Sequence, residues 1–158
     1  MLLYHGSNLP VEKPLLLKAS HPTDFGAGFY TTTNYEQAVG FAKRVVKLRS
    51  GLAIVSIYEL NEAEIERDLI LRFENPNADW LHFVVDNRML KLAEINFDIV
   101  IGPVANDDVY ETIIAFENGI YDEHETIKRL QVRSLYNQYV FKNQEAMNKL
   151  IFKEAKNV

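Results

Sequence analysis

The chain has 158 residues, of which 47% are hydrophobic and 25% charged, a composition typical of one soluble domain with its own core. It contains no cysteine, which excludes disulfide frameworks, thiolate zinc sites and cysteine nucleophiles and fits a reducing compartment. The formal net charge of -5 argues against a protein whose main task is to hold nucleic acid by its phosphates. An enzyme that touches RNA or DNA briefly is still compatible with this charge.

No apolar run approaches the ~20 residues of a membrane span. The first residues, Met1 to Gly6, lack the basic region and the apolar length of a signal peptide. We therefore expect a cytoplasmic protein that does not act at a membrane. It is expected to form a single domain over residues 1–158, without linkers or internal repeats.

The first strand is predicted at Leu2 to His5, and it is ended by Gly6 and the polar residues after it. Residues 8–23 contain three prolines and are expected to form a loop. A histidine at a strand end beside a glycine can reach into a cleft. The alternative, which the residues by themselves favour, is that His5 hydrogen-bonds a neighbouring loop.

Residues 24–41 hold the most informative pattern in the chain. Gly26 and Gly28 precede the stretch 29–32, whose aromatic and β-branched residues favour a strand. On that strand Gly28, Tyr30 and Thr32 share one side, so Tyr30 points where the glycine leaves room. Taken alone the pattern is weak evidence for a ligand site. It is not a Rossmann fingerprint, because the glycines precede the strand and a third glycine is missing.

A helix follows this strand, and two capping boxes compete for its start: Thr33 with Glu36, or Asn34 with Gln37. The remaining elements are predicted from hydrophobic periodicity, β-branched content and capping residues. Strands are expected at 52–60, 67–73, 97–104, 136–141 and 150–152, and helices at 34–48, from 75–77 onward, from 106–108 onward, at 122–135 and at 142–149.

Five polar or aromatic residues in these later elements require a choice between a structural and a functional role. Asp107 and Asp108 either hold a metal or cap a helix, and capping is the better reading because Asp favours helix starts. Trp80, the only tryptophan, is expected in the core or an interface, and Arg88 is expected to be solvated or ion-paired. Gln138, within an aromatic strand, is either exposed at an edge or directed at something polar.

Three segments in this order resemble the ADP-ribosyltransferase superfamily, in its poly(ADP-ribose)-polymerase-like, diphtheria-toxin-like branch. The segment from Leu3 to Ser7 resembles the strand with the first motif histidine. The segment from Phe25 to Phe41 resembles the glycine-rich motif with a tyrosine and, eleven positions later, a second aromatic. The segment from Tyr136 to Phe141 resembles the late strand whose second residue is usually glutamate. The chain also resembles uncharacterised bacterial domains of this superfamily that are encoded in toxin–antitoxin-like pairs.

The resemblance implies an α+β fold with two packed, mainly antiparallel sheets and flanking helices around an NAD cleft. It implies that NAD+ is the co-substrate and that no metal takes part. The implied roles are carried by residues that line the dinucleotide: His5 at the adenosine-side ribose, the Gly6 backbone at the carboxamide, Ser7 and Gly28 along the ligand, and Tyr30 and Phe41 stacked on the nicotinamide. Ala38 stands where the family usually has a serine near the carboxamide.

The departure from the family is Gln138, which replaces the glutamate. A glutamine can hydrogen-bond a ribose hydroxyl, but it is neutral and cannot act as a base. The resemblance, with His5, Tyr30 and Gln138 as catalytic residues, therefore implies an enzyme that transfers one ADP-ribose to a protein or nucleic-acid acceptor. It also implies a small antitoxin as partner. Two alternatives stay open: an inactive module that binds NAD+ or ADP-ribose, and an NAD+ glycohydrolase.

Overall fold

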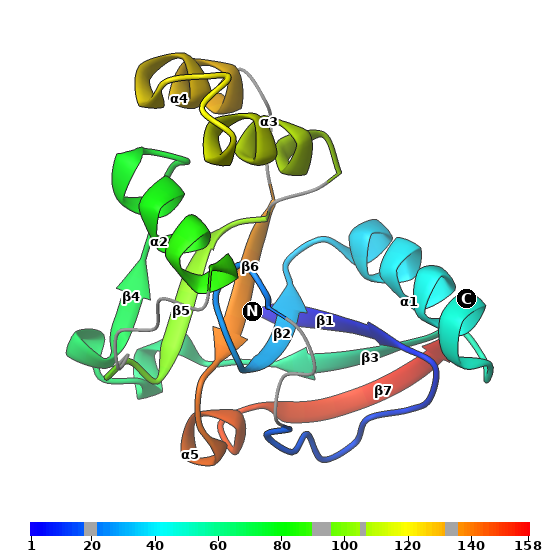
Figure 1. Ribbon diagram of the computed structural model, residues 1–158. Coiled ribbons are helices and arrows are strands. Elements are labelled where there is room, and N and C mark those ends of the chain that lie inside the picture. The colour runs from blue at the N-terminus through cyan, green and yellow to red at the C-terminus, as the bar shows by residue number, and fades with distance from the viewer. Residues whose placement is uncertain (18–21, 90–95, 105–106, 132–135) are drawn as a thin grey trace.

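The computed structural model describes residues 1–17, 22–89, 96–104, 107–131 and 136–158. Within these residues the chain forms an α+β fold of seven strands and five α-helices (Figure 1). In chain order the elements are β1 (Leu2–Ser7), β2 (Phe29–Thr32), α1 (Tyr35–Arg49), β3 (Ile54–Glu59), η1 (Glu62–Glu64), η2 (Arg67–Leu69), β4 (Ile70–Arg72), α2 (Ala78–Arg88), β5 (Ile99–Pro103), α3 (Asp107–Glu117), α4 (Glu123–Gln131), β6 (Asn137–Phe141), α5 (Gln144–Met147) and β7 (Ile151–Asn157).

Four elements differ in length from their prediction. The first strand does not end at His5, because β1 continues through Gly6 to Ser7 in its pairing with β3. The strand expected at 67–73 is shortened to β4, because the 3-10 turn η2 takes up its first half. The helix expected at 142–149 is reduced to the single turn of α5. The terminal strand runs to Asn157, because β7 pairs with the full length of β3. The expected end of the fourth helix, 132–135, and residue 106 lie outside the described residues.

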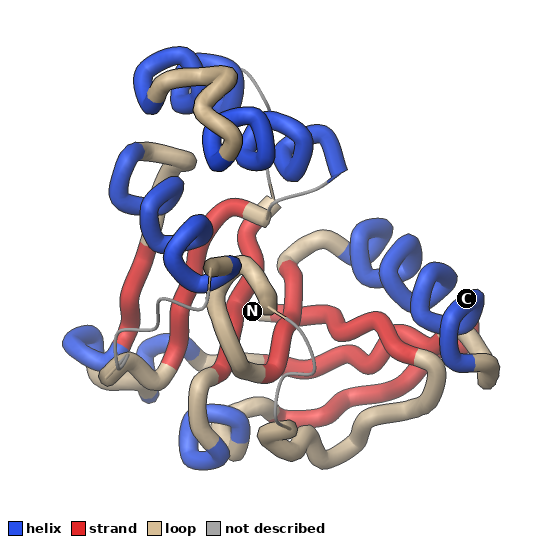
Figure 2. Tube along the Cα trace, in the orientation of Figure 1, coloured by secondary structure: helices blue, strands red, loops and turns tan. Residues whose placement is uncertain are grey.

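The strands form one mixed sheet in the order β4-β5-β6-β2-β1-β3-β7. Five of its pairings are antiparallel and one, β4 with β5, is parallel, so the expected antiparallel character is confirmed. Two separate packed sheets are not confirmed, since β1 pairs with β2. The pairing of β1 with β2 has a single register pair, in which Tyr4 lies opposite Thr32. The β1-β3-β7 half runs steeply across the β4-β5-β6 half (Figure 2).

The register assigns every strand residue to one of two faces, because side chains alternate along a strand. Thr32 lies opposite both Tyr4 on β1 and Gln138 on β6, so these three side chains share a face. Helices α1, α2 and α3 pack on this side, which is termed the helix face. The opposite side is covered by α5 and is termed the α5 face; its side chains include Leu3, Phe29, Tyr139 and Phe141.

Capping explains where the helices on the helix face begin. Asn34 accepts a hydrogen bond from the Gln37 N–H at 2.8 Å, which selects this pair over Thr33 with Glu36. Asn77 caps α2 through the Trp80 N–H at 2.9 Å. The Trp80 side chain is fully buried and its indole N–H donates to the Pro103 carbonyl at 3.2 Å, which confirms a core role. In the described part of the chain, every helix is too short or too polar to cross a membrane.

Candidate active site

His5 on β1 is tied to the strand that carries Tyr30. Its Nδ1 lies 2.7 Å from the Tyr30 carbonyl oxygen, and its ring packs on Phe29 at 4.4 Å between centroids. A carbonyl only accepts hydrogen bonds, so Nδ1 carries the proton. Burial lowers the pKa of His5 by more than the hydrogen bond to Tyr30 raises it. The imidazole is therefore neutral at pH 7 and fixes the backbone of β2 against β1.

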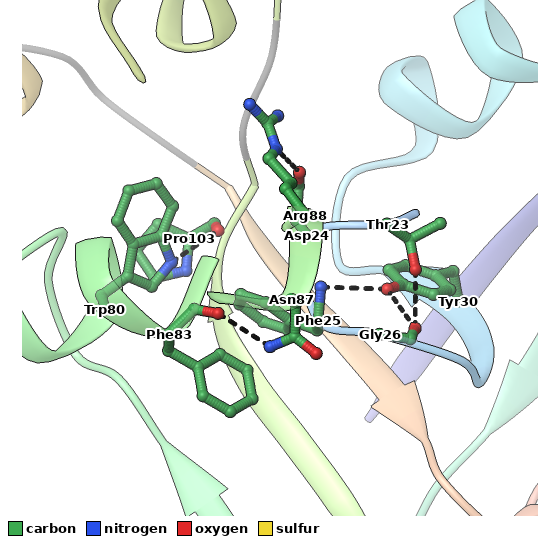
Figure 3. A network of polar contacts seen from close by, with 10 residues as sticks. All are labelled: Thr23, Asp24, Phe25, Gly26, Tyr30, Trp80, Phe83, Asn87, Arg88 and Pro103. Atoms are coloured by element: carbon green, nitrogen blue, oxygen red, sulfur yellow. Dashed lines mark hydrogen bonds and ion pairs between the residues drawn. The ribbon is translucent and has the colours of Figure 1, made fainter. Parts of the chain in front are cut away.

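Tyr30 on β2 uses its hydroxyl inside the turn that precedes the strand. The hydroxyl donates to the Gly26 carbonyl at 2.7 Å and accepts from the Phe25 N–H at 3.1 Å (Figure 3). Thr23 donates to the same Gly26 carbonyl at 2.7 Å. Burial is the main reason why the pKa of the Tyr30 phenol lies well above its usual value. The hydroxyl thus stays protonated and structural, and the half-buried ring is the part that can contact a ligand.

The same turn is held by charged side chains from distant elements. Arg88 at the end of α2 donates through Nε to Asp24 at 2.7 Å, with side chains only 14% and 19% exposed (Figure 3). Burial raises the pKa of the Asp24 carboxyl by more than the Arg88 charge lowers it. Lys142 after β6 donates to the Phe25 carbonyl at 2.5 Å, and burial lowers its pKa to about 8. The expectation that Arg88 is ion-paired is confirmed.

Gln138 on β6 is buried, with 6% of its surface exposed. Its Nε2 is buried and has no hydrogen-bond partner within the described chain. The residue opposite it, Thr32, donates its hydroxyl to the Gln37 side-chain oxygen at 2.6 Å. The side chain is thus not at an exposed edge, and its Nε2 has no partner among the residues that the structure describes. An unpaired buried donor of this kind costs about 1–3 kcal/mol unless a ligand or water supplies an acceptor.

The two glycines assigned to the dinucleotide have packing reasons for their small size. A Cβ on Gly6 would lie 2.1 Å from the Ala38 carbonyl oxygen of α1. A Cβ on Gly28 would lie 2.5 Å from Val140 on β6. Each glycine lets a neighbouring element approach the strand closely. Ala38, 2% exposed, contributes to the α1 contact on Gly6, so a larger residue at this position would also separate helix and strand.

Phe41 and Ser7 lie in surroundings that differ from the implied ones. Phe41 on α1 is 49% exposed, and the Arg44 guanidinium sits 5.7 Å from its ring centroid. Ser7 donates to the Leu9 carbonyl at 2.5 Å and so supports the loop after β1. Neither residue contacts Tyr30 through a ring or hydrogen bond in this structure.

The structure therefore brings together two of the three residues implied to be catalytic. Tyr30 and Gln138 lie on the helix face, since Tyr30 is two residues from Thr32 and opposite Val140. The His5 ring lies on the α5 face, where it packs on Phe29. On the helix face Tyr30 and Gln138 lie two register positions apart, and His5 is linked to this pair only through the backbone of Tyr30.

Charged groups that the sequence reading did not assign to the site are Asp24 and Lys142. The composition of residues 23–26 predicts a tight turn, but it does not identify the side chains that contact this turn. Among the described residues, no cluster of three or more metal-binding side chains could hold a metal ion. Asp107 opens α3, in line with a position at a helix start, and its side chain lies outside what the structure describes.

The fold and the site define an α+β protein whose helix face carries polar and aromatic side chains, among them the buried Gln138, whose Nε2 has no partner in the described chain. The model of a family described as "Protein of unknown function (DUF3990)" matches residues 1–152, so the chain belongs to the DUF3990 family. No curated protein and no solved structure matches the chain.

Proposed function

We propose that this DUF3990 protein is an NAD+-dependent mono-ADP-ribosyltransferase of the cytoplasm, the toxin of a toxin–antitoxin pair. It would transfer ADP-ribose to a protein or nucleic-acid acceptor and release nicotinamide. The proposal rests on the order of the three motifs and on one observation in the structure. That observation is the buried, unpaired Nε2 of Gln138 on the face that also carries the Tyr30 ring.

An amide donor and an aromatic ring suit the two parts of NAD+ that an enzyme must hold. The Tyr30 ring would stack on the flat, positively charged nicotinamide, with a cation–π contribution of about 0.5–2 kcal/mol. The Gln138 Nε2 would donate to a ribose hydroxyl and orient the sugar. His5 would act at a distance, because its hydrogen bond to the Tyr30 carbonyl fixes β2.

The reaction breaks the bond between ribose C1′ and the nicotinamide nitrogen. The bonding pair stays on that nitrogen, which becomes neutral, and C1′ passes through an oxocarbenium-like centre. A lone pair of the acceptor then forms the new bond to C1′, and the acceptor proton passes to solvent. Because Gln138 cannot take a proton, the acceptor group must be nucleophilic without a general base at this position, as a carboxylate is.

The test begins with calorimetric titration of NAD+, followed by nicotinamide release and transfer of label from labelled NAD+ into a lysate. Treating the lysate separately with protease and nuclease identifies the acceptor class. Gln138→Leu should weaken NAD+ binding about tenfold or more, since a hydrogen bond to the ribose is lost. Gln131→Leu, which replaces an exposed glutamine of α4, is the matched control and should bind normally. Absence of NAD+ binding to the wild type would overturn the proposal.

Gln138→Glu separates the chemistry from binding. A glutamate restores the group that can stabilise positive charge and deprotonate an acceptor. Chain elongation or faster NAD+ hydrolysis in this variant would support the proposal, and loss of all activity would count against it.

The second candidate is an inactive module that binds NAD+ or ADP-ribose. It is favoured by the same neutral Gln138 and by the full engagement of the Tyr30 hydroxyl in its own turn. Binding of NAD+ without nicotinamide release would support the module. Release without labelled macromolecule would instead support an NAD+ glycohydrolase.

A further inference from the structure

A cavity of about 370 Å³ lies where the end of α2, the helix α3 and the turn before β2 meet. This volume falls within the range of small-molecule sites, roughly 300–1,000 Å³. Its described lining is half apolar and half charged: Pro22, Met89 and Tyr110 on the one hand, Asp24, Arg88 and Glu117 on the other.

Arg88 has only part of its hydrogen-bonding capacity used. Its Nε donates to Asp24, and its Cζ lies 4.6 Å from the centroid of the Tyr110 ring. The Nη1 is buried and has no acceptor among the described residues. Because a buried guanidinium N–H without an acceptor is costly, this edge of Arg88 favours an oxygen atom from outside the chain.

Glu117, which also lines the cavity, has an acceptor atom without a donor among the described residues. Its Oε1 is buried without a donor in the described part of the chain, and it forms no direct ion pair with Arg88. Arg88 already shares its charge with Asp24. The three charged groups carry a net charge of -1, which follows from two carboxylates and one guanidinium. The cavity therefore favours a group that brings a positive donor to Glu117 and an acceptor to Arg88.

We propose that this cavity binds a small organic cation whose ammonium adjoins a carbonyl oxygen, the chemistry of an α-amino amide or of the first residue of a peptide. The ammonium donates to Glu117, and the carbonyl accepts from Arg88. An apolar side chain rests on Pro22, Met89 and Tyr110. The site is independent of the NAD+ chemistry proposed above, and its test uses no NAD+.

The test uses leucinamide as probe, with binding measured by calorimetry and by the 15N–1H signal of Arg88 Nε. N-acetyl-leucinamide keeps the carbonyl and removes the positive charge, so it should bind at least about tenfold more weakly. Glu117→Gln should weaken leucinamide binding by a similar factor. Glu111→Gln, which changes an exposed glutamate of the same helix, should leave it unchanged. The tripeptide Leu-Gly-Gly carries the same ammonium and carbonyl on a longer chain. It should bind if the cavity accepts the N-terminus of a peptide, and bind poorly if the cavity accepts only a free amide.

Leucinamide binding that shifts the Arg88 signal and depends on both the ammonium and Glu117 would support the site. Equal affinity for the acetylated probe, unchanged affinity in Glu117→Gln, or no binding of leucinamide would each overturn it. The comparison of the two probes on the wild-type protein decides the question even if Glu117→Gln does not fold.

Discussion

The Tyr30 hydroxyl both donates to the Gly26 carbonyl at 2.7 Å and accepts from the Phe25 N–H at 3.1 Å. Both capacities of the phenol are thus used within a turn that is only a few residues away. Phe25 is fully buried, so its N–H has no water to replace the hydroxyl. It follows that the hydroxyl and the ring of Tyr30 can be tested separately, since the hydroxyl closes the turn and the ring lies on the helix face.

Tyr30→Phe should therefore lower the free energy of unfolding by about 1–3 kcal/mol, because the buried Phe25 N–H loses its acceptor. Chemical denaturation measures this loss. Tyr136→Phe, at a residue that is 52% exposed, is the control and should change stability by less than about 0.5 kcal/mol. Under the proposed function, NAD+ affinity should survive in Tyr30→Phe and be lost in Tyr30→Ala. A Tyr30→Phe protein as stable as the wild type would contradict the structural role of the hydroxyl.

Arg88 and Tyr30 should be energetically coupled, although 58 positions separate them along the chain, since both hold the turn at residues 23–26. Arg88→Met leaves Asp24 buried without its partner and should cost about 2–4 kcal/mol. In a double-mutant cycle with Tyr30→Phe, the two costs should differ from additivity by at least about 0.5 kcal/mol.

The control for this cycle is Arg129→Met, which removes an exposed ion pair with Glu125 on α4. Its cost should be about 0.5 kcal/mol or less and should add to that of Tyr30→Phe. Strict additivity of Arg88→Met with Tyr30→Phe would show that the ion pair and the phenol hold the turn independently.

Local sequence was sufficient to predict β2 and α1, because glycines, β-branched residues and a capping asparagine mark both ends of these elements. It was insufficient for β7, a strand whose side chains are mostly exposed and which therefore lacks the apolar alternation of a buried strand. The length of β7 is set by its pairing with β3, an interaction over about a hundred positions that no local pattern reveals.

The arrangement of the implied site residues could be predicted from the sequence only in part. Alternation along β2 correctly placed Tyr30 with Thr32 and Gly28. The face of His5 depends on the register between β1 and β2, and a shift of one residue would exchange the faces of a whole strand. The pairing of Asp24 with Arg88 joins a turn to the end of α2, 64 positions apart, so the sequence offered only the general expectation of an ion pair.

The packing of α1 on β1 can be tested by replacing glycine with alanine at two positions, Gly6 on β1 and Gly40 within α1. Gly6→Ala would place a Cβ 2.1 Å from the Ala38 carbonyl oxygen and 2.9 Å from the Ala42 nitrogen, so the helix backbone must move. We expect a loss of about 3 kcal/mol or more in the free energy of unfolding. Gly40 lies within the same helix with open space around its Cβ position, and Gly40→Ala should stabilise the protein by about 0.5–1 kcal/mol. A mild effect of Gly6→Ala in denaturation experiments would show that α1 does not press on β1.

Lys142 should give the stability of the protein a measurable dependence on alkaline pH. Its pKa falls from 10.5 to about 8 in the folded state because the amine is buried. At pH 7 the amine is charged in both states, and the folded state bears the cost of burying the charge. As pH rises from about 8 to 10.5, the folded state releases its proton first, so this cost disappears and stability rises.

The difference in unfolding free energy between the wild type and Lys142→Met isolates this contribution, because the other titrating groups cancel. We expect the difference to shift in favour of the wild type by roughly 1–2 kcal/mol between pH 8 and 10, after allowance for partial solvent exposure. Lys149→Met, which replaces an exposed lysine a few residues later, is the matched control. A flat difference for Lys142→Met would mean that its ammonium is solvated and does not hold the Phe25 carbonyl as a buried charge.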